Sequence, residues 1–248
     1  MKYRKFLLII SLLLLLVSCS GANTEPITAQ TPGIWNHYFV YPLSQLIIFI
    51  AKLLNENYGL AIIVVTIIVR LLLFPLIIKQ LKTSQVMQKV QLELNELKER
   101  KDLQEDQQKY MQEMMTVFQK YKVNPFSGCL PLFIQMPILI AFYYAIMRTQ
   151  EIALHSFLWF SLGSADPYFI LPVVATVTTY LSLKTATSGY PNQPQMNIML
   201  YVMPAMIFAA AVVMPSALVL YWIVGNLFSI GQSYILNVQK RKWQTESE

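Results

Sequence analysis

A single arginine, Arg70, lies near the middle of a stretch of 19 almost wholly apolar residues, 60–78. A stretch of this length is typical of a membrane-spanning helix. A cation at the centre of such a helix costs roughly 3 kcal/mol on insertion scales. The 15 Leu, Ile, Val and Phe residues of the stretch offset this, because together they favour insertion by roughly 7 kcal/mol. The segment therefore still inserts, and we expect Arg70 to face a polar cavity inside a helix bundle.

The composition is that of a polytopic membrane protein. Hydrophobic residues make up 55% of the chain and charged residues only 13%, whereas soluble domains have about 25% charged residues. The net charge of +6 arises from basic residues beside the apolar segments, which indicates topology and contact with anionic lipid rather than with DNA. The two cysteines, Cys19 and Cys129, imply no disulfide framework.

The amino terminus has the pattern of a secretory signal. A basic segment at 2–5 precedes the apolar run 6–17, and the sequence Leu-Val-Ser-Cys ends at Cys19. This ending resembles a bacterial lipobox. The resemblance implies a lipoprotein signal peptide at 1–18 and a mature chain that begins with an N-palmitoyl, S-diacylglycerol Cys19 in the outer leaflet. The alternative is an uncleaved first span with an incidental cysteine.

Hydropathy predicts an all-α membrane protein with five transmembrane helices. The expected spans are 58–78, 128–148, 167–184, 198–213 and 217–236. The short connection 214–216 predicts that the last two spans are antiparallel neighbours. Residues 19–57 are expected to form an external tether and then an amphipathic helix at 43–54. This helix either lies on the outer membrane surface or packs on the bundle.

Basic residues set the orientation. The connection 79–122 holds nine Lys and Arg residues, and the tail 237–248 carries Lys240, Arg241 and Lys242. Because loops rich in Lys and Arg stay inside the cell, both segments are expected in the cytoplasm, together with the loop 185–197. We therefore expect a plasma-membrane protein with its amino terminus outside, in agreement with lipidation at Cys19.

The segment 79–123 is expected to be a cytoplasmic antiparallel helical hairpin. It contains neither Gly nor Pro, and it carries two apolar stripes: Val90, Leu94 and Leu97, then Met111, Met114, Met115, Phe118 and Tyr121. One continuous helix would be about 65 Å long and would leave both stripes exposed, so we expect a turn near 101–106. The methionine-rich stripe packs within the hairpin or binds a partner, since methionine adapts to varied surfaces.

Several polar or amphipathic side chains lie inside the predicted spans: Gln135, Thr178, Ser182, Trp222 and Asn226. Such residues ordinarily form hydrogen bonds between membrane helices. Arg70 differs because it is charged, and no Asp or Glu occurs in any predicted span. We therefore expect Arg70 to face water, backbone carbonyls or a transient anionic ligand.

The pattern argues against several classes of enzyme and transporter. The sequence has no HExxH motif, no paired intramembrane Asp and no Gly-rich phosphate loop, and its two histidines, His37 and His155, fall in the expected exterior regions. We expect no enzymatic activity, no cofactor and no metal. A small channel or transporter that uses Arg70 as a selectivity charge remains an alternative, as does a structural chaperone that only scaffolds other complexes.

Three motifs carry a resemblance to a known family. They are YGLAI at 58–62 with Arg70 and FPL at 74–76, NPFSGCLP at 124–131 with QMPI at 135–138, and LYWIVGNLF at 220–228. Together they resemble the YidC/Oxa1/Alb3 membrane protein insertases, and in particular the lipoprotein forms of Gram-positive bacteria. The resemblance extends over essentially the whole mature chain.

The resemblance implies a groove and a set of partners. Five spans would enclose a hydrophilic groove that opens to the cytoplasm and to lipid. Arg70 and Gln135 match groove residues, and Trp222 matches an aromatic residue that faces substrate. Members of this type often carry glutamine near Ser182, so this wall of the groove would be less polar. Nascent membrane proteins would be inserted and folded here, alone or with the Sec translocon. The basic tail would be a topology anchor or contact the ribosome.

Overall fold

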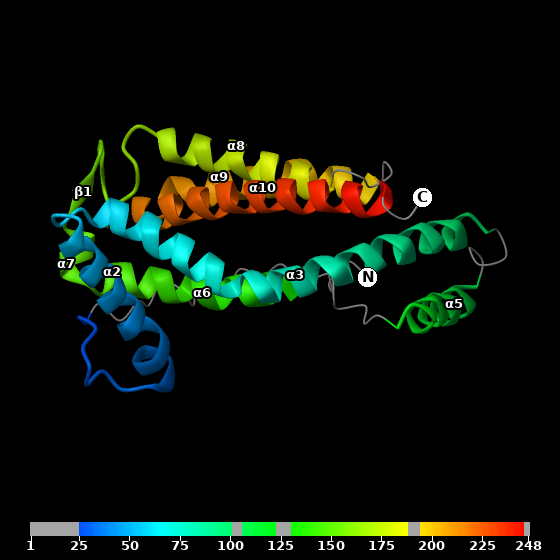
Figure 1. Ribbon diagram of the computed structural model, residues 1–248, viewed down its shortest axis with the longest axis horizontal. Coiled ribbons are helices and arrows are strands. Elements are labelled where there is room, and N and C mark those ends of the chain that lie inside the picture. The colour runs from blue at the N-terminus through cyan, green and yellow to red at the C-terminus, as the bar shows by residue number, and fades with distance from the viewer. Residues whose placement is uncertain (1–24, 101–105, 123–129, 188–193, 246–248) are drawn as a thin grey trace, which may run out of the picture.

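The polypeptide is almost entirely helical, and the computed structural model describes residues 25–100, 106–122, 130–187 and 194–245. Helices α3, α6, α8, α9 and α10 run along the long axis of the molecule (Figure 1). A helical hairpin extends from one end, and a cap of short elements covers the other. The signal peptide, Cys19 and most of the predicted turn at 101–106 lie outside the described residues.

Helix α3, Tyr58–Glu99, is the longest element of the fold, with 42 residues. Its amino terminus is capped by Asn57, whose side-chain oxygen accepts a 3.0 Å hydrogen bond from the backbone N–H of Leu60. The sequence predicted a boundary between a span and a hairpin at residue 78, but the helix continues without a break, even through Pro75. The reason is that residues 79–99 contain only helix-compatible residues and no further Gly or Pro.

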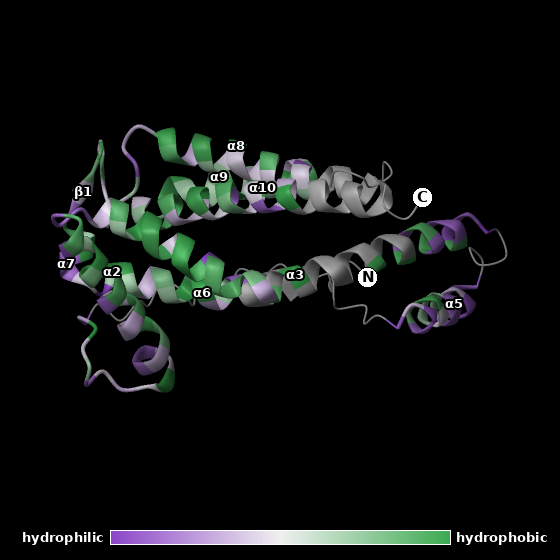
Figure 2. Cartoon of the chain, in the orientation of Figure 1, coloured by the Kyte–Doolittle hydropathy of each residue, from purple (hydrophilic) through white to green (hydrophobic). Residues whose placement is uncertain are grey.

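Four further helices complete the bundle: α6 (Leu130–Met147), α8 (Ile170–Thr187), α9 (Pro194–Val213) and α10 (Ser216–Thr245). Helix α8 packs against both α9 and α10, and α3 packs against α10. Apolar residues dominate these helices over most of the bundle (Figure 2). Within a membrane, such helices associate through close packing and interhelical hydrogen bonds, because lipid is as apolar as leucine.

Helices α9 and α10 do not pack as the sequence predicted. Only Met214 and Pro215 separate them, yet α9 packs mainly on α8. A cavity of about 150 Å³ lies between the two helices, bounded by Ile207 and Met214 on one side and by Leu218 and Trp222 on the other. Near the connection, Ala211 of α9 shares the buried core with Ala217 and Leu218 of α10, so the two helices adjoin there although α9 packs mainly on α8.

The end cap closes the bundle opposite the hairpin. It comprises the π-helix η2 (Asn36–Val40), α2 (Tyr41–Leu53), α7 (Gln150–Ala153) and the paired strands β1 (Ser156–Phe157) and β2 (Phe160–Ser161). Helix α2 packs on α3 and α6, and both Ile47 and Ala51 are fully buried. The sequence left open whether this helix packs on the bundle or lies on the outer membrane surface. Its inner face packs on the bundle, while Phe49 and Leu53 remain exposed.

Arg148 attaches the segment that precedes η2 to the end of α6. It is only 5% exposed, and its guanidinium donates to the backbone oxygen of Glu25 and to Oδ1 of Asn36, each at 2.9 Å. The backbone oxygen of Arg148 accepts from the N–H of Ile27 at 2.9 Å. Among the described residues, these bonds hold a buried cation in place without an ion pair to a carboxylate.

Helix α5, Gln107–Lys120, lies against the distal half of α3 and forms the hairpin (Figure 1). A small separate core joins them, made of Val90, Leu94, Leu97, Val117 and Phe118. Asp106 caps α5 by accepting 3.0 Å hydrogen bonds from the N–H groups of Gln108 and Lys109. The stripe of Met111 and Met115 faces outward, so those two methionines do not pack within the hairpin.

Truncating Phe118 tests whether this small core holds the hairpin together. Because the side chain is 8% exposed, Phe118→Ala should cost about 3–5 kcal/mol. Native-state hydrogen exchange of the full chain in detergent should show the loss in α5. Met115→Ala is the matched control, since this neighbour is 46% exposed and its truncation should stay within about 0.5 kcal/mol. Equal losses in the two variants would contradict the assignment.

The ion pair Lys120–Glu93, at 2.7 Å, predicts a pH window for the hairpin. The hydrogen bond from Lys120 lowers the pKa of Glu93, and the same bond raises the pKa of Lys120. The pair therefore stabilises the hairpin between the ordinary pKa values, about 4.3 and 10.4, and the gain is lost below and above them. Lys120 is exposed and Glu93 is partly exposed, so solvent screens the pair and the effect should be small.

Spin labels at the exposed positions Leu92 and Met111 should report this window. The distance distribution between α3 and α5 should broaden as the pH falls below about 4.3. Glu93→Gln should remove the acid step. Broadening that is unchanged in Glu93→Gln would assign the transition to other groups.

Candidate functional site

Side chains from three helices meet around Arg70. The half-buried Arg70 of α3 donates from Nη2 to Oε1 of Gln135 on α6, at 3.4 Å. Gln135 in turn donates from Nε2 to the hydroxyl of Tyr221 on α10, at 2.8 Å. The chain of contacts fixes the amide orientation, because its NH₂ faces the tyrosine and its carbonyl faces the cation. The structure thus brings together two of the residues that the sequence predicted.

Gly225 provides the space for the guanidinium. A Cβ atom at this position would lie 2.5 Å from Nη2 of Arg70 and 3.3 Å from its Cζ. The first of these distances is far shorter than a van der Waals contact. Any other residue at 225 would therefore displace the arginine, so Gly225 sets how closely the guanidinium approaches α10.

Tyr221 is held rigidly by its neighbours. It is 2% exposed, and its ring stacks on Phe142 of α6 with centroids 4.3 Å apart and planes 28° apart. The stacked pair is part of the main core cluster. This packing places the hydroxyl where Gln135 needs an acceptor, since a buried amide without hydrogen bonds is costly.

A second polar cluster joins α10 to α8. Nδ2 of Asn226 donates to the hydroxyl oxygens of Thr179, at 2.8 Å, and Thr178, at 3.3 Å. Both threonine hydroxyls donate to backbone oxygens one turn earlier, Thr178 to Val174 and Thr179 to Ala175. Each hydroxyl therefore acts as donor and acceptor at once, and two of the predicted groove residues, Thr178 and Asn226, are in contact.

Within the part of the chain that the structure describes, the charge of Arg70 is not neutralised. Among the described residues, the hydrogen bond to Gln135 is its one polar side-chain contact, and no carboxylate lies within ion-pair distance. A neutral amide satisfies one N–H and leaves the positive charge in place. The arrangement can therefore attract an anionic group that enters the bundle.

Two predicted site residues lie apart from this cluster. Trp222 lines the apolar cavity between α9 and α10, because it follows Tyr221 and points about 100° further around the helix. Ser182 lies one turn beyond Thr178 on α8, and among the described residues its hydroxyl makes no hydrogen bond to Arg70, Gln135 or Asn226. The structure therefore separates an apolar wall at Trp222 from the polar cluster.

Sequence reasoning missed Tyr221, Gly225 and Thr179. A signal for the first two was present, since Tyr221 and Gly225 are four residues apart and share a helix face. The need of Gln135 for a hydrogen-bond partner also pointed to a nearby hydroxyl. Thr179 gave no signal. The sequence does not show which of the adjacent threonines of α8 faces α10, because this depends on how the helix is rotated about its axis.

The fold and the site define a class: a helical membrane protein with an arginine held inside its bundle by neutral partners. Two described helical segments, Tyr58–Leu76 and Ser216–Ile235, are long and apolar enough to cross a membrane, and three shorter apolar helices accompany them. The sequence matches the family described as 60Kd inner membrane protein over residues 49–243. The chain belongs to this family, which is the YidC/Oxa1 family named from its motifs.

Similar proteins have a consistent description. Membrane protein insertase YidC 2 of Bacillus anthracis is 55% identical over 233 residues, which cover 92% of this chain and 91% of that protein. Membrane protein insertase MisCA of Bacillus subtilis is 54% identical, with 92% and 88% covered. Membrane protein insertase YidC of Alkalihalophilus pseudofirmus is 51% identical, with 99% of each chain covered.

A solved structure is also similar. It is a crystal structure of an active YidC insertase with its first transmembrane domain resolved, which matches with a TM-score of 0.64 and 28% sequence identity. The match covers 79% of this chain but only 45% of that longer chain. The likeness therefore concerns a shared helical core.

A double-mutant cycle tests the polar link between α8 and α10. Asn226→Ala and Thr179→Val should show a coupling energy of about 0.6 kcal/mol, the average for hydrogen bonds between membrane helices. The measurement is unfolding free energy in bicelles. Thr176→Val is the matched control, because Thr176 donates to the backbone of Pro172 and should not couple to Asn226. Equal coupling of both threonines would contradict the link.

Proposed function

We propose that this chain is a membrane protein insertase and chaperone, which transfers hydrophilic segments of nascent membrane proteins across the bilayer. The observation that carries the proposal is Arg70, a cation inside the bundle whose described side-chain partner is the neutral Gln135. The names of the similar proteins support it. The chain needs no cofactor and breaks no covalent bond in this role, so it is not an enzyme.

The proposed topology has five membrane-spanning helices. The first half of α3 would be the first span, and α6, α8, α9 and α10 would be the others. The α5 hairpin and the basic carboxyl terminus would lie in the cytoplasm because they carry most of the Lys and Arg residues. The end cap and a lipidated Cys19 would then lie outside the cell.

The mechanism is electrostatic. A hydrophilic segment must cross a hydrocarbon layer that rejects charge, and a polar groove from the cytoplasm shortens the dry distance. Acidic residues of the segment would be attracted to Arg70, because charges interact more strongly where the dielectric constant is low. The polar groups of Asn226, Thr178 and Thr179 would line the same path. The bond between Arg70 and Gln135 is long and its acceptor is a neutral amide, so an incoming carboxylate can replace it.

The apolar helix of the substrate would leave by another side. Trp222 and the apolar cavity between α9 and α10 offer a surface along which such a helix moves into lipid, driven by its own hydrophobicity. Larger substrates would be passed between this protein and the Sec translocon. The basic tail would anchor the topology or contact a ribosome.

The end cap favours an insertase over a channel. A channel needs a path that opens on both sides of the membrane. In the described part of the chain, the side chains of Ile47, Phe160 and Leu162 fill the end of the bundle beyond Tyr58, with at most 1% exposed. These buried side chains would block a continuous path for ions from one side of the membrane to the other. A polar segment of a substrate could still enter as far as Arg70 before it meets this barrier.

The charge of Arg70 predicts a set of insertion phenotypes. Arg70→Ala should impair insertion of substrates with acidic external segments, while Arg70→Lys should retain part of the activity because it keeps the charge and loses the planar geometry. Gln135→Glu should behave like Arg70→Ala, because a carboxylate at 3.4 Å would pair with the guanidinium and cancel its charge. Protease protection in reconstituted vesicles measures insertion.

The matched control is Gln135→Met, which removes the amide without adding charge and should impair acidic substrates less than Gln135→Glu. Substrates whose external segment has been neutralised should be insensitive to all four variants. Normal insertion of acidic substrates by Gln135→Glu would refute the electrostatic role. Tolerance of Arg70→Ala with intact spans would instead favour a scaffolding chaperone.

A further inference from the structure

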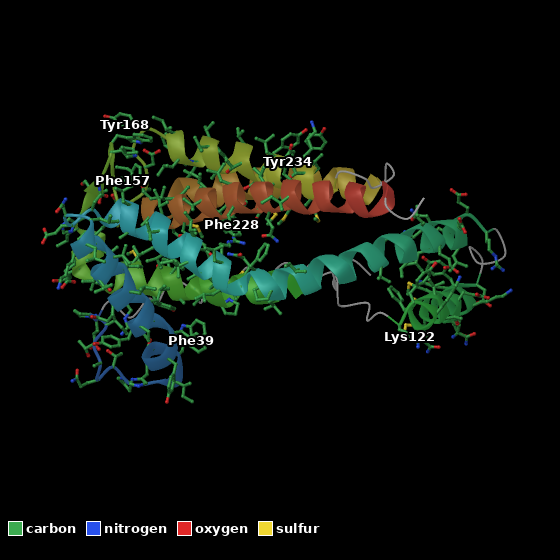
Figure 3. The ribbon with its side chains drawn as sticks, in the orientation of Figure 1. Phe39, Lys122, Phe157, Tyr168, Phe228 and Tyr234 are labelled. Atoms are coloured by element: carbon green, nitrogen blue, oxygen red, sulfur yellow. The ribbon has the colours of Figure 1, made fainter. Side chains whose placement is uncertain are left out.

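A cluster of large apolar side chains lies exposed at the capped end of the bundle. We call it the apolar rim, and it consists of Leu154, Leu158, Trp159, Tyr168 and Phe169. Their exposed fractions are 80%, 73%, 40%, 66% and 50%, respectively. Tyr168 and the neighbouring Phe157 lie at the end opposite Lys122 of the hairpin (Figure 3). Exposed apolar groups gathered in this way mark an interaction surface.

The backbone holds two rim residues in an unusual conformation. Leu158 has φ of 54° and Phe169 has φ of 57°, in the left-handed region that bulky residues rarely adopt. Such a conformation persists only where the surroundings impose it. Both residues direct large apolar side chains outward, which a folded chain in water alone would not favour.

The rim is also firmly supported. The carboxylate of Asp166, 4% exposed, accepts hydrogen bonds from the indole of Trp159 at 3.1 Å and from the N–H groups of Tyr168 and Leu171 at 3.1 and 2.7 Å. Phe157 packs against the backbone of α3, where a Cβ on Gly59 would lie 2.1 Å from its ring. The rim is therefore a fixed surface on the bundle.

The composition of the rim indicates its partner. No Lys or Arg occurs between residues 150 and 183, so the rim itself provides no lysine or arginine for lipid phosphates or for an acidic protein. Tryptophan and tyrosine favour the boundary between headgroups and acyl chains. Exposed apolar residues continue from the rim along α8, at Ile170, Val173, Val174 and Val177. The rim is thus continuous with a helix face suited to lipid.

We propose that the apolar rim docks into the headgroup–acyl boundary of the bilayer leaflet at the capped end, and that this contact sets the depth of the bundle. Tyr58 lies at the same depth in the membrane as the rim, since its ring lies 4.3 Å from that of His155, the residue after Leu154. Arg70 follows twelve residues later on α3, which places it about 18 Å deeper. In a hydrocarbon layer of about 30 Å, the charge then lies about 12 Å from the opposite boundary.

A single-tryptophan chain tests the docking directly. Trp35, Trp222 and Trp243 are replaced by Phe, and the full chain with Trp159 is reconstituted in phosphatidylcholine vesicles. Lipids brominated near the headgroup should quench Trp159 more than lipids brominated near the chain end, and aqueous iodide should quench weakly. Addition of anionic lipid or salt should change nothing, since no cation takes part. Strong iodide quenching with no effect of brominated lipid would overturn the proposal and would leave the rim free for a protein partner.

A second variant separates docking from folding. Leu158→Gly removes the apolar side chain at a position whose φ glycine adopts readily, so the chain should unfold no more easily in detergent than its parent. Quenching of Trp159 by brominated lipid should nevertheless fall, and quenching by iodide should rise. Unchanged quenching in Leu158→Gly and in the matching Phe169→Gly would show that these side chains do not contact lipid. The readout is independent of insertion activity, so it stands whether or not the electrostatic mechanism holds.

Discussion

The contact between Arg70 and Gln135 is the interaction on which the proposed site depends. A guanidinium has several N–H donors and no acceptor, and in the described structure one of them bonds to a protein side chain, at 3.4 Å. A carboxylate in place of Gln135 would satisfy the donors better, but it would also cancel the charge. A neutral amide keeps the cation oriented and available. The remaining donors need water or an anionic ligand, so the site is consistent with a hydrated groove.

The side chains packed around Arg70 and Gln135 hold the two residues in this orientation. Tyr221 is fixed by its stacking on Phe142, and it holds the amide of Gln135 so that the carbonyl points to Arg70. Gly225 leaves the space that the guanidinium occupies. The cluster therefore depends on the packing of three helices, α3, α6 and α10. Close packing of this kind is also what holds helices together in lipid, so stability and site geometry share one cause.

The sequence predicted the elements better than their contacts. Arg70, Gln135, Thr178 and Asn226 were singled out because polar groups are costly in apolar helices, and the structure brings these residues into two clusters. The choice between Tyr221 and Trp222 depended on the rotation of α10, which adjacent aromatics do not reveal. The continuous α3 and the cavity between α9 and α10 depend on tertiary packing, which hydropathy does not encode.

A comparison of two arginines sharpens the role of Arg70. Arg148 lies at the capped end, is 5% exposed, and has two acceptors at 2.9 Å in the segment before α2. Its charge-assisted bonds are short and join parts of the chain that are far apart in sequence, which is typical of a structural cation. Arg70 has one long bond to a neutral group in the same bundle. Because the described residues give Arg148 two short bonds and Arg70 a single long one, more of the donors of Arg70 are left for a ligand that arrives from outside the chain.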